Sequence, residues 1–360
     1  MTDLRITGLI KSYDDATRVL DGLDLTVPDG RLAAVLGPSG CGKTTMLRIL
    51  AGFLRADGGT VELGGQVVAG PGVHLPPERR RIGIVPQEGA LFPHLNVARN
   101  VAFGLPGVPV AERRRRTEEM LELVGLPGYG NRMPHELSGG QQQRIALARA
   151  LAPEPGLVLL DEPFNALDSA LRAGVRADVR AALRATGATG VLVTHDQQEA
   201  LSTADLVAVV RAGRVAQCAA PEEVYRSPAD PWVAGFVGDA VLLPGTVEGA
   251  TALTALGPVP LAAHSGAVGT GKDSTDSTVS GGTGTVVLRP EQLTLTEAGV
   301  DRPPGTVVDV HFYGHDAMVV VAVPGLDTPV SVRVSGPVGV RPGEKTGIAV
   351  TGRTVLYSAP

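Results

Sequence analysis

Residues 37–45 read Gly-Pro-Ser-Gly-Cys-Gly-Lys-Thr-Thr, and they fit the pattern of a glycine, four variable residues, Gly-Lys and then Ser or Thr. The five residues before this stretch are apolar, and their run is short enough for a buried strand. After it, apolar residues recur at helical spacing until Gly58 and Gly59 end the segment. A strand, a glycine-rich loop and a helix in this order are typical of a phosphate-binding loop.

The residue types in this loop suit nucleotide phosphates. Glycines allow backbone N–H groups to point at phosphate oxygens, and the N-terminus of the following helix adds partial positive charge. Lys43 supplies a charge for the β- and γ-phosphates, and the Thr44 hydroxyl is a ligand for Mg²⁺. We expect a nucleoside triphosphate to be bound by Gly37, Pro38, Ser39, Gly40, Cys41, Gly42, Lys43, Thr44 and Thr45.

Polar residues also follow three other short apolar runs, and they are Gln87, the pair Asp161-Glu162, and His195. Ligands bind at the carboxyl ends of the strands in an open α/β sheet. Asp161 is placed to hold Mg²⁺, and Glu162 is placed to polarise the attacking water as a general base. Gln87 and His195 are candidate contacts for the γ-phosphate. The alternatives are a solvated turn for the acidic pair and a structural role for the histidine.

A second glycine-containing element precedes a stretch rich in Ala and Leu that favours a helix. Ser138 is a good N-cap, and a serine with two glycines at a helix N-terminus can bind an anion. The element comprises Leu137, Ser138, Gly139, Gly140 and Gln141. Because one phosphate loop is already present, this element indicates either a second ligand or a second copy of the protein that shares its nucleotide.

The remaining patterns outline the architecture. Alternating runs at 4–9 and 20–27 and a hairpin at 60–68 predict strands, and a mixed, largely helical region from about 88 to 155 interrupts the α/β pattern. Tyr13 lies between the first two strands, where its ring could stack on an adenine or simply pack against the fold. Three consecutive arginines at 79–81 are interpreted as a solvated loop, with an interface role as the alternative.

Composition limits the class of protein. The chain has 360 residues and is 43% hydrophobic, which suffices for two domains with cores. Its formal net charge of −5 argues against a general nucleic-acid binder. Two cysteines are too few for a disulfide framework and favour a reducing compartment. The sequence has no apolar run of membrane-spanning length and no signal-peptide core, so we expect a soluble, cytoplasmic protein, and docking to an integral membrane partner stays open.

The composition changes beyond about residue 240. Short alternating runs rich in Val, Thr, Gly and Pro predict a small all-β domain in the form of a barrel, and residues 265–284 have the composition of a flexible loop. We therefore expect one domain at 1–237 and a second at 238–360.

With these motifs in view, residues 1–237 resemble the nucleotide-binding subunit of ATP-binding cassette transporters, because five motifs stand in that family's order. With the β domain, the chain is similar to importer ATPases of the maltose, polyamine and ferric-iron group. The segment Leu288-Arg289-Pro290-Glu291 resembles a recurring piece of that group's accessory domain, called TOBE. The implied fold is an α/β P-loop NTPase core with an antiparallel β subdomain and a helical insertion at about 88–155, followed by an OB-like barrel.

The resemblance also implies roles for single residues. Tyr13 would stack on adenine, Glu162 would act as the base, and His195 would contact the γ-phosphate. Asp168 would couple the two sites of a dimer, and Asn165 stands where the family usually has serine. The implied Mg²⁺ ligands are Thr44, Gln87 and Asp161, and Gln87 would also sense the γ-phosphate. The element at 137–141 would close over the ATP bound to the other subunit.

The implied function is ATP hydrolysis that energises a membrane importer by closing a homodimer, with ATP and Mg²⁺ as ligands. Residues 88–104 would contact the membrane permease at the cytoplasmic face of the cell membrane, and a periplasmic or lipoprotein solute-binding protein would act indirectly. Ferric-iron importers are the nearest resemblance. Polyamine, thiamine, sulfate, molybdate and sugar importers are alternatives, as is a non-transport cassette ATPase, and the β domain is a candidate regulatory module.

Overall fold

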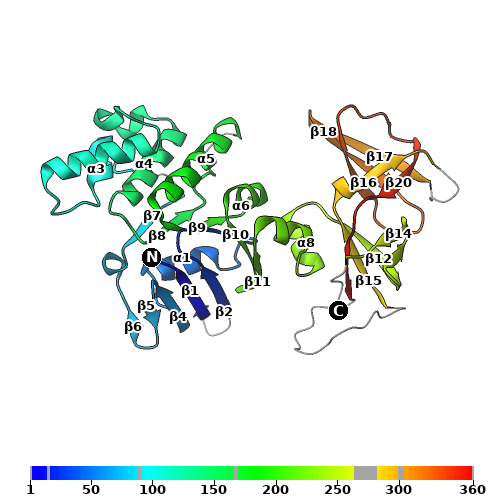
Figure 1. Cartoon of the computed structure of the whole chain (residues 1–360), viewed down its shortest axis with the longest axis horizontal. Helices are drawn as coiled ribbons and strands as arrows, with labels where there is room; N and C mark the ends of the chain where they lie inside the picture. The colour runs from blue at the N-terminus through cyan, green and yellow to red at the C-terminus, as the bar shows by residue number, and fades with distance from the viewer. Residues whose placement is uncertain are drawn as a thin grey trace. The chain divides into compact units, whose positions relative to one another are not determined.

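The computed structural model describes residues 2–13, 17–87, 91–165, 169–262, 282–298 and 304–358 (Figure 1). Contacts divide the chain into two compact units, Met1–Val224 and Tyr225–Pro360. The division falls inside α7 (Pro221–Arg226), before the boundary at residue 237 that we expect from composition. Helix α8 (Pro231–Val237) therefore groups with the second unit.

A six-stranded sheet forms the centre of the first unit. Its strands are β3 (Leu32–Leu36), β7 (Ile82–Val85), β8 (Leu157–Asp161), β9 (Thr189–Thr194), β10 (Leu206–Arg211) and β11 (Arg214–Ala219). Their order is β11-β10-β3-β9-β8-β7, and all neighbours are parallel except the β10–β11 pair. Every residue of β3 and β9 is buried, as expected for parallel strands that are covered on both faces.

A second, antiparallel sheet packs on the helix that follows the phosphate loop. Its strands are β1 (Leu4–Ser12), β2 (Arg18–Val27), β4 (Gly58–Leu63), β5 (Gln66–Gly70) and β6 (Val73–His74). The helix is α1 (Lys43–Ala51), and its Met46 and Leu50 are fully buried in one core cluster with Ile6 of β1 and Val191 of β9. This shared core holds α1 between the two sheets and thereby fixes the position of the loop at its N-terminus (Figure 1).

The other helices of the first unit complete the core. They are α2 (Val97–Ala102), α3 (Val110–Leu123), α4 (Gly139–Leu151), α5 (Ser169–Thr186) and α6 (Gln197–Thr203). Helix α4 contacts β7 and α5, and α6 contacts β3 and β9. The three helices from α2 to α4 fall within the range that we expect for the helical insertion. Among the described helices, none is both long enough and apolar enough to cross a membrane.

The second unit contains two five-stranded antiparallel sheets in its described part. One has the order β14-β13-β12-β15-β21 and the other has the order β16-β20-β17-β18-β19. The strands are β12 (Val241–Glu248), β13 (Thr251–Thr254), β14 (Gly257–Pro260), β15 (Thr283–Leu288), β16 (Leu293–Thr296), β17 (Gly305–Phe312), β18 (Asp316–Ala322), β19 (Val330–Ser335), β20 (Lys345–Val350) and β21 (Val355–Ser358). One core cluster, which includes Leu243, Val286, Val319 and Ile348, spans both sheets. The predicted all-β domain is confirmed.

Arg289 ties the helical start of the second unit to its sheets. The side chain is 5% exposed, and its guanidinium donates hydrogen bonds of 2.8–3.2 Å to the carbonyl oxygens of Tyr225, Ala234, Gly238 and Asp239. It also stacks on the Tyr225 ring, with Cζ 4.0 Å from the ring centroid. A single buried cation thus satisfies carbonyl groups at the ends of two short helices.

Candidate functional site

Four neighbouring parallel strands end at one edge of the central sheet, and each is followed by a predicted site residue. Gly37 follows β3, His195 follows β9, Asp161 ends β8 and is followed by Glu162, and Gln87 lies just beyond β7. Because the strands are adjacent and parallel, the sheet brings these residues to the same edge. The clustering that we predicted from the separate strand ends is therefore present in the fold.

The phosphate loop has the backbone that its glycines predict. Gly42 has φ +105°, and a Cβ at this position would lie 2.7 Å from the Val19 carbonyl oxygen, so no other residue fits without a shift. Gly42 is also the N-cap of α1, and it leaves the first N–H groups of the helix without a side-chain cap. Acidic residues are absent from the first turn of α1. These N–H groups and the helix dipole are available to an anion.

Lys43 lies across the loop. Its side chain is buried, and Nζ donates hydrogen bonds to the carbonyl oxygens of Gly37 at 2.6 Å and Pro38 at 2.9 Å. The two threonines that follow differ, since Thr44 is exposed and Thr45 is buried. The Tyr13 hydroxyl lies 3.3 Å from the Thr45 hydroxyl, while 59% of the Tyr13 residue is exposed. The fold thus places the Tyr13 ring beside the loop with its surface available for stacking.

Glu162 is held by two neighbours. One carboxylate oxygen lies 3.3 Å from His195 Nδ1, and the other accepts a hydrogen bond from Asn165 Nδ2. Glu162 has φ +44°, an uncommon conformation for a residue with a side chain, and its N–H donates to the Val193 carbonyl oxygen at 2.9 Å. Such strained positions are concentrated at functional sites. The Glu162–His195 contact joins two of the predicted catalytic residues directly.

Asp161 lies in a different environment from Glu162. Its burial, together with the adjacent Glu162 charge, raises the pKa of the Asp161 carboxyl, and the positive charges of Arg48 and Lys43 oppose this rise. A partly buried carboxylate close to the loop lysine is suited to serve as a ligand for a cation. In the described part of the chain, no group of three or more His, Cys, Asp or Glu side chains is arranged to hold a metal ion. A cation here would therefore rely on hydroxyl, amide and phosphate oxygens as well.

Gln87 is linked to the helix that begins at the second glycine element. Its carbonyl oxygen accepts a hydrogen bond of 3.0 Å from Gln143 Nε2, and Gln143 is 4% exposed on α4. The sequence reasoning did not identify Gln143. The sequence feature that points to Gln143 is the run of three glutamines at 141–143, whose third member falls on the buried face of α4.

The second glycine element has the predicted helix start. Ser138 is the N-cap of α4 and forms a capping box with Gln141, with hydrogen bonds of 3.0 and 3.4 Å. Leu137 and Gly140 are buried, whereas Ser138 and Gly139 are exposed. In the described part of the chain, no hydrogen bond or ion pair joins residues 137–141 to residues 37–45. Asp168 lies outside the described residues.

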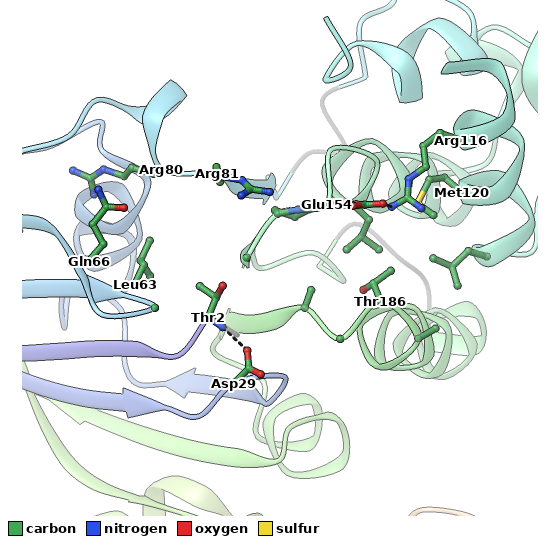
Figure 2. A pocket seen from close by; sticks show the side chains of 18 of the residues that line it. Thr2, Asp29, Leu63, Gln66, Arg80, Arg81, Arg116, Met120, Glu154 and Thr186 are labelled. Carbon is green, nitrogen blue, oxygen red and sulfur yellow. Dashed lines mark hydrogen bonds and ion pairs between the residues drawn. The ribbon is translucent and has the colours of Figure 1, made fainter. Parts of the chain in front are cut away.

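A cavity of about 740 Å³ lies at the opposite edge of the central sheet (Figure 2). It is lined by Arg81, Gly156 and Ala188, which precede β7, β8 and β9. Glu154 extends into this cavity and pairs with Arg116 at 3.2 Å (Figure 2). The cavity is thus separated from the phosphate loop by the length of the strands, and we do not assign it to the nucleotide.

Comparisons with known proteins agree with this geometry. The family model described as ABC transporter matches residues 20–165, and the TOBE domain model matches residues 286–356. The chain is 47% identical to Fe(3+) ions import ATP-binding protein FbpC 1 of Rhodococcus jostii, over 99% of each chain. It is 44% identical to Fe(3+) ions import ATP-binding protein FbpC of Pseudomonas fluorescens, over 100% of this chain and 99% of the relative.

A solved structure is also similar. It is a dimeric ATP-binding cassette in a post-hydrolysis state bound to ADP and Pi, with 31% identity and a TM-score of 0.53. The similarity covers 61% of this chain and 98% of that one. With relatives 44–47% identical over nearly its whole length, the chain belongs to the ATP-binding proteins of ABC transporters.

Proposed function

We propose that the chain is the ATP-hydrolysing subunit of a ferric iron importer, which it drives by ATP-dependent closure of a homodimer. The observation that carries the proposal is the shared edge at which the phosphate loop lies beside the Glu162–His195 contact of 3.3 Å. A nucleotide on the loop would have its terminal phosphate directed at this edge. Glu162 and His195 would then lie beside the γ-phosphate, where the attacking water must approach.

The residues at this edge fit Mg-ATP. The uncapped N–H groups of α1 and the Lys43 ammonium are donors for phosphate oxygens, and the exposed Tyr13 ring is a surface for the base. Thr44, Gln87 and Asp161 offer only oxygen ligands, as Mg²⁺ requires. Bound Mg²⁺ would neutralise charge on the β- and γ-phosphates.

Glu162 is the proposed base. Its carboxylate would accept a proton from the attacking water, and the hydrogen bond from Asn165 would keep it oriented. His195 would hold the other oxygen of Glu162 and contact the γ-phosphate. We propose that Asp168 couples this site to its counterpart in the dimer.

The second glycine element supports a homodimer. Ser138 and Gly139 are exposed at the N-terminus of α4, and no hydrogen bond joins this element to the phosphate loop within the described chain. We propose that residues 137–141 close over the ATP of the partner subunit. The dimeric state of the similar cassette structure is consistent with this arrangement.

The helical region is the proposed permease contact. Helices α2 and α3 line a groove of about 930 Å³ together with Pro127, Gly128, Gly130 and Asn131. Phe103, the C-cap residue of α2, is 60% exposed and packs on Phe92, with ring centroids 4.3 Å apart. We propose that the part of 88–104 within the described residues contacts the permease at the cytoplasmic face of the membrane, and that a solute-binding protein delivers the cargo to the permease.

The cargo is proposed from the relatives, several of which are named Fe(3+) ions import ATP-binding proteins at 44–47% identity. None of the site residues described above would contact the cargo, so importers of polyamine, thiamine, sulfate, molybdate or sugar use the same chemistry. The test is uptake of radiolabelled ferric iron by proteoliposomes that contain this chain and its permease. Transport of another solute in place of iron would contradict the cargo and leave the ATPase proposal intact.

The ATPase proposal is tested with Glu162→Gln. General-base loss lowers turnover about 100-fold or more, while ATP should still bind and close the dimer, as light scattering would show. The matched control is Glu154→Gln, which removes an exposed carboxylate at the far end of β8. Undiminished hydrolysis by Glu162→Gln would sink the assignment of the base.

A further inference from the structure

Four arginines lie in a row on α5, one turn apart, and the structure divides them into two pairs. Arg172 and Arg176 reach Asp196, at 3.8 and 3.2 Å, at the catalytic edge of the sheet. Arg180 and Arg184 both reach Asp205, at 3.3 and 3.2 Å. Asp205 accepts a hydrogen bond from the Leu32 N–H, at the amino end of β3, so the second pair lies at the opposite edge. One face of α5 thus carries one arginine pair at the catalytic edge of the sheet and a second, matched pair at the opposite edge.

Arg176 is connected to both sides of His195. Its Nη2 donates to Asp196 Oδ2 at 3.2 Å and to Glu199 Oε1 at 3.1 Å. Glu199 is 1% exposed, and its other oxygen accepts a hydrogen bond of 2.5 Å from the Thr194 hydroxyl. The Asp196 N–H in turn donates to that hydroxyl at 3.0 Å. Thr194 and Asp196 are the residues on either side of His195, so this network fixes the turn that presents the histidine.

The same guanidinium also faces the loop that carries the proposed base. Arg176 Cζ lies 6.0 Å from the centroid of the Phe164 ring, within the range of a cation–π contact. Phe164 is fully buried and lies two residues after Glu162. Arg176 itself is 13% exposed, because it fills the space behind both segments. Among the described residues, no hydrogen bond or ion pair joins Arg176 to Glu162 or His195.

We propose that Arg176 is a positioning residue that holds the Glu162 segment and the His195 turn at the separation at which the two side chains meet. This inference rests on the proposed function, since it assumes that Glu162 and His195 take part in hydrolysis. Glu162 and His195 are 3.3 Å apart yet come from different loops, so their relative position depends on packing behind them. Misplacement of a reacting group by about 1 Å can lower turnover about 100-fold.

The variants must separate positioning from folding. Arg176→Met alone would leave the Glu199 carboxylate buried without its cation, which destabilises a fold. The double variant Arg176→Met with Glu199→Gln avoids this, because glutamine can keep the Thr194 hydrogen bond without a charge. Arg176→Lys retains the positive charge and tests whether that charge is enough to preserve kcat. Arg180→Met is the control, as it breaks an ion pair of the same helix at the far edge.

The assay is steady-state ATP hydrolysis by the full chain, with nucleotide affinity measured by titration of a fluorescent ATP analogue. We expect the double variant to lower kcat between about 10- and 100-fold with affinity unchanged, Arg176→Lys to recover most of kcat, and Arg180→Met to match wild type. In the Glu162→Gln background, adding the double variant should lower the residual single-turnover rate no further, because the two changes act on one step.

Two outcomes would overturn the inference. One is a kcat for the double variant within about twofold of Arg180→Met, and the other is full additivity with Glu162→Gln. Failure of the proposed function is a separate result, since it would appear as normal turnover by Glu162→Gln alone. The experiment therefore distinguishes failure of the inference from failure of the proposed function.

Discussion

Replacing Arg80 with alanine should destabilise the first unit through α1, the helix that carries the phosphate loop. The Arg80 side chain is 5% exposed. Its Nη1 donates to the carbonyl oxygens of Ile49 at 2.5 Å and Leu50 at 2.8 Å, which are among the last in α1, and its Nε donates to Leu75 at 2.7 Å. A cation at this end also complements the helix dipole. Arg80 is thus a C-terminal cap for α1.

The size of the effect follows from the partners that remain. The Ile49 carbonyl keeps a hydrogen bond from the Gly52 N–H, whereas Leu50 and Leu75 lose their charged donor. Each buried carbonyl left without a partner costs about 1–3 kcal/mol. The guanidinium is itself costly to bury, and this burial lowers the pKa of Arg80. We therefore expect a net loss of about 3 kcal/mol, near the lower end for breaking a buried charged network.

Thermal unfolding followed by circular dichroism measures this loss. For a unit of this size, about 3 kcal/mol corresponds to a fall in Tm of roughly 6–12 °C. The transition of the first unit is the one that ATP raises, because ligands stabilise the state that binds them. Arg79→Ala is the matched control, since Arg79 is exposed. If Arg80→Ala and Arg79→Ala shift this transition equally, the capping argument is wrong.

Two further predictions concern other buried charges. Arg289→Ala removes the donor to carbonyls within 225–239 and should lower the free energy of unfolding of the second unit by about 3–5 kcal/mol while ATP hydrolysis persists. An unchanged second thermal transition would contradict the role of Arg289. Burial raises the pKa of Asp205, but the Leu32 N–H and two arginines outweigh it and hold the pKa below its usual value. A carboxyl group with a depressed pKa stabilises the folded state at pH values above the pKa of the unfolded state. This stabilisation is lost as pH falls through the pKa of the folded state. Asp205→Asn should therefore lower the free energy of unfolding at pH 7 by about 1–2 kcal/mol. The difference should shrink as pH falls below the unfolded pKa of about 4 and vanish only below the lower pKa of the folded state. A difference that persists in acid would refute this account.

One interpretation of the sequence is wrong. Residues 79–81 were expected to form a solvated loop, yet Arg80 is buried between two exposed neighbours. A run of arginines predicts exposure because a buried guanidinium needs several acceptors. Those acceptors come from α1 and from Leu75, and no local pattern indicates that they meet Arg80.

The sequence by itself determined the parts of this protein that depend on local chemistry. The glycines of residues 37–45 specify a loop backbone that few other residues can adopt, and Ser138 specifies the start of α4 through a capping box that spans residues 138–141. The polar residues after apolar strands could be placed together in advance, because parallel neighbours must end at one edge. The loop backbone and the helix start depend on interactions within a few residues of chain, and the shared strand edge depends only on the strands being parallel.

Only the tertiary structure decided which distant side chains support that edge. Arg176 and Glu199 meet across α5 and α6, and Gln143 reaches Gln87 from α4. The four-residue spacing of the α5 arginines was visible, but it cannot say which acid each one faces. That choice depends on how the helices pack on the sheet, because a buried charge takes whichever partner the packing brings within reach.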